Sequence, residues 1–286
     1  MGAPGGRELR CQLPAATWAA LDARMARTGE RLEDAAAACI AEALDAKLHS
    51  IFQVSTSGAL VKGVYGAATT IADVKRHGDI GLGTFVGLDG EGIMLDGQCW
   101  RAASDGRVMP VGDDVAAPFW VTAGFNADRT RTLATVSDWQ HLCSQLDGMR
   151  PSGNLFAALR IRGVFDLVHA RVACKARPGA SLVEATSSQS EFRWTEVAGT
   201  LVGFWTPAWV RTINVPGFHL HFLSDDRSRA GHVIDLRAKG VVAELHAASD
   251  LHLVLPANEQ FLRADLSGDP AAALAKAEGG TPSRRA

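Results

Sequence analysis

The sequence predicts a mixed α/β (α+β) fold, in which a small strand-helix-helix module precedes a larger part that is rich in β-strands. From Gly81 onward, short runs of alternating apolar and polar residues are separated by glycine-containing turns, a pattern typical of β-strands. Helical periodicity occurs near the start of the chain and in short segments that begin at Thr, Ser or Pro residues. Sheets are therefore expected to form most of the structure from residue 81 on.

The composition is typical of a soluble globular protein. The chain has 286 residues, is 47% hydrophobic and carries a formal net charge of -2, so it can bury a sizeable core and gives no reason to expect a polyanionic partner. No run approaches the roughly 18 apolar residues of a membrane span, and the first residues lack an apolar signal segment, which predicts a cytoplasmic protein. The five scattered cysteines, never in Cys-x-x-Cys spacing, indicate neither a disulfide framework nor a thiolate zinc site.

Residues 1–48 are expected to form the small module. Apolar and polar residues alternate over 8–13, which predicts a strand; a helix begins at Pro14 and stops at Gly29, and a second helix covers 32–47. One strand and two helices in about 40 residues cannot bury a core alone, so a partner copy is expected.

This order resembles the ribbon-helix-helix family, whose members dimerise by pairing the strand across a two-fold axis. In that family the outward strand residues read DNA bases, and here they would be Glu8, Arg10 and Gln12. Glu8 is a poor residue to face phosphates, and the segment lacks a dense Lys/Arg cluster. We therefore favour an oligomerisation module over a DNA-binding one.

The following segments are predicted in order. A short helix is expected after Ser55, a Thr-capped helix ends at Gly78, and Ser137 is expected to cap a third helix. Strands are expected at 83–88, 92–102 and 116–125, as a pair within 154–176, and at 193–210. The glycine-rich residues 78–92 lie within strands rather than between a strand and a helix, so they predict no nucleotide-binding loop.

Residues 214–236, NVPGFHLHFLSDDRSRAGHVIDL, contain three of the nine histidines in one predicted hairpin. Residues two apart in a strand point to the same face, so His219 and His221 project together, and His232 begins the second strand and can lie opposite them. An isolated His-x-His would indicate only a half-exposed strand, but the third histidine favours a metal. Three imidazoles without cysteine suit Zn²⁺, or Fe, Ni, Mn or Cu, at an open catalytic site.

Four separated strings together resemble α-acetolactate decarboxylase: HGDIGLGTFVGLDGE (77–91), LDGQCWR (95–101), GTLVGFWTP (199–207) and NVPGFHLHFLSDDRSRAGHVID (214–235). The resemblance covers about residues 52–266. It implies two β-rich subdomains, which we assign to 49–160 and 161–266, with a bound zinc ion and a homodimer or larger homo-oligomer. The implied reaction converts 2-acetolactate to (R)-acetoin and CO₂, a step toward 2,3-butanediol.

The resemblance also implies the site residues. The zinc ligands would be His219, His221 and His232, with Glu91 as a metal-proximal acid, base or ligand. Arg171 would bind the departing carboxylate or the enediolate. A tail, residues 267–286, would bring a further acid into the site. We assign that role to Glu278, with Glu259 as the alternative.

Two other functions remain open from the sequence. A cupin-like oxygenase that binds Fe(II) through three histidines would offer a similar hairpin, but it would consume O₂, whereas a decarboxylase releases CO₂ anaerobically. A DNA-binding sensor of a small molecule is also compatible with a module of 48 residues at the start of the chain.

Overall fold

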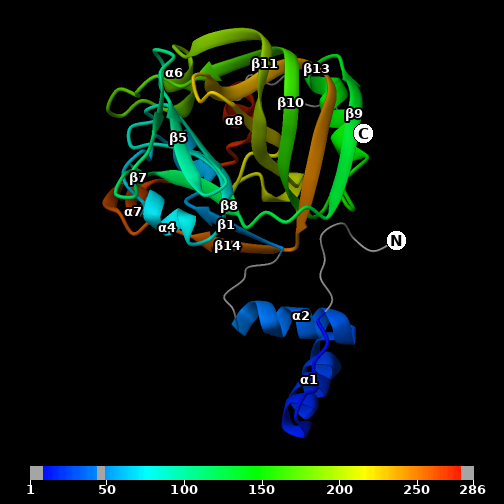
Figure 1. Cartoon of the computed structure of the whole chain (residues 1–286). Helices are drawn as coiled ribbons and strands as arrows, with labels where there is room; N and C mark the ends of the chain where they lie inside the picture. Colours follow the sequence, from blue (N-terminus) through cyan, green and yellow to red (C-terminus); the bar gives the residue numbers. More distant parts are fainter. Residues whose placement is uncertain (1–8, 44–48, 278–286) are drawn as a thin grey trace. The chain divides into compact units, whose positions relative to one another are not determined.

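The computed structural model describes residues 9–43 and 49–277. The chain divides into two compact units, Met1–Leu48 and His49–Ala286 (Figure 1).

The first unit contains helices α1 (Ala15–Thr28) and α2 (Leu32–Ala43), which confirms two helices at the predicted places. Gly29 ends α1 with a φ of 72°, and its N–H donates a hydrogen bond to the carbonyl oxygen of Met25. The strand predicted at 8–13 is wrong over 9–13, because these residues lie in neither a helix nor a strand; Glu8 lies outside the described residues. A strand requires a partner for its backbone groups, and a single copy of this module offers none.

The two helices leave apolar side chains on their surface. Leu21 and Ala35 are buried, whereas Trp18, Leu32 and Ile40 are each at least 40% exposed. Within residues 9–43 the apolar faces are thus only partly covered by the module itself.

The second unit is built on two sheets. The first has seven strands in the order β14-β1-β8-β3-β4-β5-β6, and all neighbours are antiparallel except β14 and β1. Its strands are β1 (Ser50–Val54), β3 (Ile80–Thr84), β4 (Glu91–Leu95), β5 (Gln98–Ala102), β6 (Val108–Pro110), β8 (Phe119–Ala123) and β14 (Asp250–Val254).

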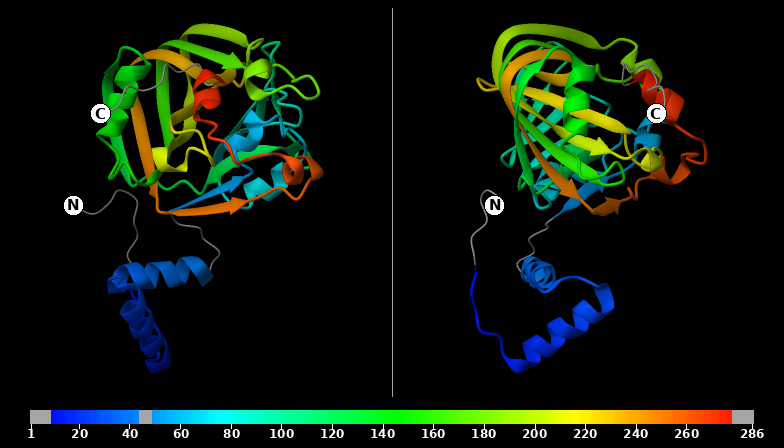
Figure 2. Two further views of the ribbon diagram at one scale, coloured as in Figure 1. Left: turned by 180° about the vertical axis from the view of Figure 1, so that it is seen from behind. Right: turned by 90° about the vertical axis from the view of Figure 1, so that its right-hand side faces the viewer.

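The second sheet has five longer strands in the order β10-β11-β12-β13-β9. They are β9 (Arg129–Val136), β10 (Phe156–Val172), β11 (Ser190–Thr206), β12 (Gly217–Ser224) and β13 (Ala230–Ala248). Strand β13 also pairs with β10, so the sheet curls back on itself, as both views in Figure 2 show.

Strand β10 corrects two predictions. The pair of strands expected within 154–176 is one continuous strand of 17 residues, and the subdomain boundary predicted between residues 160 and 161 falls inside it. Its register against β13 shifts between Arg162 and Phe165, and such an irregularity lets a long strand bend without ending. The chain changes sheet between β8 and β9 instead, and it returns to the first sheet in β14.

Short elements connect the strands. They are α3 (Ser57–Val61), α4 (Ile71–Lys75), α5 (Trp139–Asp147), α6 (Leu182–Thr186), α7 (Glu259–Arg263), α8 (Ala271–Ala277), the 3₁₀ turn η1 (Ala208–Val210) and the small pair β2 (Thr69–Thr70) and β7 (Ala116–Ala117). Thr70 caps α4 as predicted, but the helix ends at Lys75 rather than at Gly78. The cap of α5 is Asp138 rather than Ser137: the Asp138 carboxylate accepts the backbone N–H of His141 at 2.8 Å, while the Ser137 hydroxyl donates to Asp138.

The two sheets share an apolar core that holds the site between them. Leu82 of the first sheet and Val202 and Leu223 of the second belong to one buried cluster, which Leu274 of α8 completes. Glycines in the first sheet make room for the ring of Trp120, since a Cβ at Gly83 or Gly92 would come within 2.5 Å of it. Packing against Trp120 therefore explains Gly83 and Gly92 in the glycine-rich sequence 78–92.

Candidate active site

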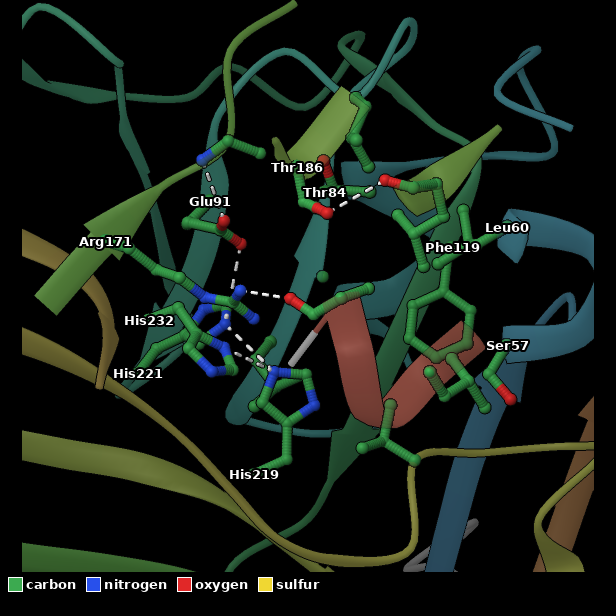
Figure 3. A pocket seen from close by; sticks show the side chains of 18 of the residues that line it. Ser57, Leu60, Thr84, Glu91, Phe119, Arg171, Thr186, His219, His221 and His232 are labelled. Atoms are coloured by element: carbon green, nitrogen blue, oxygen red, sulfur yellow. Dashed lines mark hydrogen bonds and ion pairs between the residues drawn. The ribbon is translucent and has the colours of Figure 1, made fainter. Parts of the chain in front are cut away.

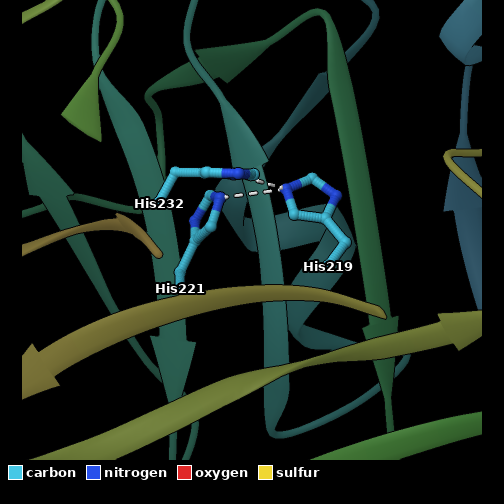
Figure 4. A group of neighbouring side chains, drawn as sticks. All are labelled: His219, His221 and His232. Atoms are coloured by element: carbon cyan, nitrogen blue, oxygen red, sulfur yellow. Dashed lines mark hydrogen bonds between the residues drawn. The ribbon is translucent and has the colours of Figure 1, made fainter. Parts of the chain in front are cut away.

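The three histidines that were predicted to form a metal site lie together on the β12–β13 hairpin (Figure 4). His221 and His232 are directly opposite in the register of these strands, and His219 lies two residues earlier on the same face as His221. The Nε2 atom of His219 is 3.2 Å from Nε2 of His221 and 3.0 Å from Nδ1 of His232. The three rings thus direct nitrogen atoms toward one point.

Burial keeps these imidazoles neutral. It lowers the pKa of His219 and His232 well below the ordinary value and that of His221 to about 4; the positive charge of Arg171 acts in the same direction on all three. The carbonyl oxygen of Gly92 accepts a hydrogen bond from Nδ1 of His221 at 3.0 Å, so the neutral ring has its lone pair on Nε2, facing the other histidines. Neutral imidazoles with converging nitrogens suit a divalent metal ion, and ring nitrogens of the three histidines all lie within 4.8 Å of one another.

Glu91 lies at the edge of this group. It is the first residue of β4, and its Oε2 atom is 3.6 Å from Nε2 of His221, while its Oε1 accepts the backbone N–H of Ala173 at 3.1 Å. Gly90 places it there: its φ is 92°, and a Cβ at this position would clash with the carbonyl oxygen of Ala102 on β5. A carboxylate therefore faces the histidines from the other sheet.

Arg171 brings a buried positive charge to the same place. It is directly opposite His232 in the pairing of β10 with β13, and only 5% of its surface is exposed. Its Nη1 donates to Oε1 of Gln189 at 3.0 Å and to the carbonyl oxygen of Ala277 at the end of α8. The guanidinium is thus held between β10, the start of β11 and α8.

These groups line one cavity of about 620 Å³, part of which is open to solvent. Figure 3 shows Glu91, Arg171 and the three histidines on one side of the cavity, with Leu60 and Phe119 on the other beside Ser57. The apolar lining includes Leu60, Leu82, Phe119, Val215 and Leu274. Such a cavity can hold a small anion with its charged group toward the arginine and its carbon skeleton against the apolar wall.

The two candidate tail carboxylates, Glu278 and Glu259, differ in their places in the chain relative to residues that line the cavity. Glu278 lies outside the described residues, one position after Ala277, which lines the cavity. Glu259 is exposed, pairs with Arg263 at 2.6 Å and does not line the cavity. The structure therefore gives no support to Glu259 as the tail acid.

The sequence reasoning missed Gln189 and Thr84, which both line the cavity. Thr84 ends β3, and its hydroxyl donates to the carbonyl oxygen of Gly90 at 2.8 Å, beside Glu91. For Gln189 a local signal existed: Ser181 and Glu184 form the capping box of α6, a Ser-x-x-Glu pattern that marks a short helix just before β11.

A second group, His49, Asp128 and His246, has ligand atoms within the same 4.8 Å of one another. Here, however, Nδ1 of His49 donates to the carbonyl oxygen of Ala247 at 2.8 Å, and Nδ1 of His246 donates to that of Asn126 at 2.7 Å. These nitrogens carry protons and offer no lone pair to an ion beside Asp128.

The described helices include none that is long and apolar enough to cross a membrane. The cytoplasmic location stays a prediction.

Known proteins resemble this chain over most of its length. The family model described as alpha-acetolactate decarboxylase matches residues 51–268. Alpha-acetolactate decarboxylase from Methanosarcina mazei is 42% identical over 229 residues, which make up 80% of each chain; that from Methylococcus capsulatus is 38% identical over 231 residues, 80% of this chain and 89% of that protein.

Solved structures also resemble this chain. The crystal structure of alpha-acetolactate decarboxylase from Bacillus subtilis strain 168 matches with a TM-score of 0.78 and 35% identity, covering 81% of this chain and 100% of that one. The geometry of the site and these likenesses together show that the chain belongs to the alpha-acetolactate decarboxylase family.

Proposed function

We propose that this chain decarboxylates 2-acetolactate to (R)-acetoin and CO₂ in the cavity between its two sheets. One observation carries the proposal: three neutral histidines, a carboxylate and a buried arginine converge in one cavity of a chain whose relatives are named alpha-acetolactate decarboxylase. The alternatives of an oxygenase and a sensor gain no support from these relatives.

His219, His221 and His232 would hold the metal ion, which we propose to be Zn²⁺ because its donors here are imidazoles at an open site. When bound, the ion would supply Lewis-acid polarisation of the substrate's ketone. The backbone carbonyl of Gly92 fixes the ring of His221, which keeps the donor nitrogen aimed at the site.

Arg171 binds the substrate carboxylate and holds the bond that will break in one orientation. A guanidinium offers a planar set of donors that keeps its charge, and its burial strengthens the attraction to an anion. When the carbon–carbon bond breaks, CO₂ leaves, and the bonding electron pair stays with the rest of the substrate as an enediolate. The charge of Arg171 then stabilises this developing anion.

Glu91 delivers the proton that completes acetoin. The enediolate carbon takes up one proton, and a carboxyl group fixed on one side of the cavity supplies it to one face, directly or through water. The hydrogen bond between Oε1 of Glu91 and the N–H of Ala173 supports this role, because it holds the carboxyl beside His221.

Glu278 is proposed as a tail group that orients the substrate. It directly follows Ala277, whose carbonyl oxygen contacts Arg171, and Leu274 and Ala277 of α8 line the cavity. Residues 267–286 would then complete one wall of the site.

The test is anaerobic incubation of the purified protein with racemic 2-acetolactate, with acetoin and CO₂ measured together. We expect equal amounts of both products without O₂, and loss of both after chelation or in His219→Ala. Metal-loaded, folded protein that produces no acetoin would rule out the proposed substrate. Turnover that requires O₂ would favour the oxygenase.

We further propose that residues 1–48 join two copies of the chain. Trp18, Leu32 and Ile40 are exposed on helices that bury little apolar surface of their own, and a second copy would cover them. Deleting residues 1–48 should reduce the oligomer size measured by light scattering and leave turnover within about twofold, because the cavity is built from residues 57–277. Unchanged oligomer size after the deletion would contradict the role of the module.

A further inference from the structure

We propose that Gln189 is a positioning residue, which sets the orientation of the Arg171 guanidinium that receives the substrate carboxylate. The inference rests on the proposed function, since it assigns Arg171 to the carboxylate. Gln189 needs no contact with the substrate, because it would act through Arg171.

The direction of the Gln189 amide follows from its partners. Arginine is a donor only, so the group 3.0 Å from Nη1 of Arg171 must be the amide oxygen, Oε1. The NH₂ group of Gln189 then points away from the guanidinium, and Gln189 lowers the pKa of the nearby Glu191 carboxyl. With the amide reversed, an NH₂ group would face the guanidinium, and that contact would be repulsive.

Glu191 is itself held in place. Its Oε2 atom lies 2.9 Å from Nε2 of His169, and the hydrogen bond from His169, with a smaller contribution from Gln189, lowers the pKa of this carboxyl below its usual value. Glu191 is also directly opposite Arg171 in the pairing of β10 with β11. His169 thus holds Glu191 opposite Arg171, the residue that Gln189 contacts.

Helix α8 completes the arrangement. The carbonyl oxygen of Ala277 accepts from the same Nη1 atom as Gln189 does, so one nitrogen of the guanidinium has two protein acceptors. Two acceptors in different directions fix the plane of the group better than one. Loss of the Gln189 acceptor should leave Arg171 in the cavity but let the plane of its guanidinium shift.

Loss of the Gln189 contact should weaken the binding of carboxylate ligands and leave the binding of neutral ligands unchanged. A guanidinium in the wrong orientation loses bidentate contact with a carboxylate, whereas a neutral ligand that does not use the arginine is unaffected. In Gln189→Leu we expect the Kd of 2-hydroxy-2-methylpropanoate to rise about 10-fold and the Kd of acetoin to change less than about twofold.

The experiment measures the Kd of these two probes by calorimetry on the metal-loaded full chain, together with kcat and KM for 2-acetolactate. Gln189→Glu is the second variant, because it keeps the size and the acceptor. Its added carboxylate competes for Arg171 and should raise the Kd of the carboxylate probe at least as much as Gln189→Leu does. The matched control is Gln145→Leu, which removes another half-buried glutamine whose amide donates to the carbonyl oxygen of Thr135 away from the cavity.

Each result has a distinct meaning. Weaker carboxylate binding in both Gln189 variants, with unchanged acetoin binding, metal content and melting temperature, supports the proposal. Equal weakening of both probes, or no change in either, overturns it. Wild-type protein that binds the carboxylate but makes no acetoin would refute the proposed function and not the positioning role.

Discussion

Among the residues that the structure describes, two groups of possible metal ligands have ligand atoms within 4.8 Å of one another, yet only one of them has the features of a metal centre. In the first, nitrogens of His219, His221 and His232 face each other, and the proton of His221 is directed away to Gly92. In the second, the ring nitrogens of His49 and His246 nearest Asp128 donate to backbone carbonyls. Proximity of ligating residues is therefore a weaker criterion than the direction of their lone pairs.

The largest expected effect separates the two groups directly. His219→Ala should reduce bound metal from about one ion per chain to nearly none and lower kcat/KM at least 100-fold, since it removes a proposed ligand. His49→Ala, the matched change in the second group, should leave both quantities unchanged. Metal analysis of dialysed protein measures the bound metal in both variants. Metal loss in His49→Ala would contradict the difference proposed between the two groups.

A second contrast concerns Glu91, the carboxylate at the edge of the first group, and Asp128, the carboxylate within the second. Glu91→Gln keeps an acceptor for the N–H of Ala173 but removes the acid, so we expect kcat to fall about 100-fold with the fold intact. Asp128→Asn should leave kcat unchanged. Steady-state kinetics with circular dichroism as a folding control decides between these outcomes, and equal losses in the two variants would contradict the assignment of Glu91.

A smaller effect concerns the dependence of the folded state's stability on pH. Burial lowers the pKa of His221 to about 4 in the folded state, whereas the unfolded chain takes up its proton near 6.5, so protonation favours unfolding between these values. Metal-free protein should therefore lose stability as pH falls from about 6.5 to about 4. His221→Ala should show a shallower fall of the melting temperature over this range, and an identical fall would argue against burial of a neutral ring.

The smallest effect concerns the stability of the second group. The carboxylate of Asp128 accepts the backbone N–H of Ala247 at 2.6 Å, so Asp128→Asn should cost only about 1 kcal/mol of unfolding free energy. Urea denaturation measures this cost. A loss several times larger, reversed by added Zn²⁺ in the wild type alone, would indicate that the second group also holds an ion.

Much of the site was predictable because its parts are local in the sequence. His219, His221 and His232 lie on one hairpin, where the two-residue period of a strand and a short turn decide which side chains meet. The two helices of the first unit and the Thr70 cap of α4 likewise follow from neighbouring residues. Glu91 and Arg171 came from a family resemblance rather than from local pattern, since a turn glutamate and a strand arginine are usually only solvated or ion-paired.

The sequence by itself determined the histidine hairpin, the mainly β character and the family. Only the tertiary structure decided that Gly92 orients His221, that Gln189 contacts Arg171, and that β10 crosses the predicted subdomain boundary without a break. The physical reason is that these contacts join residues 18 to 129 positions apart, through sheet pairing and through the packing of one sheet on the other. Local propensity has no information about such pairs, because their energies arise only when the whole core is assembled.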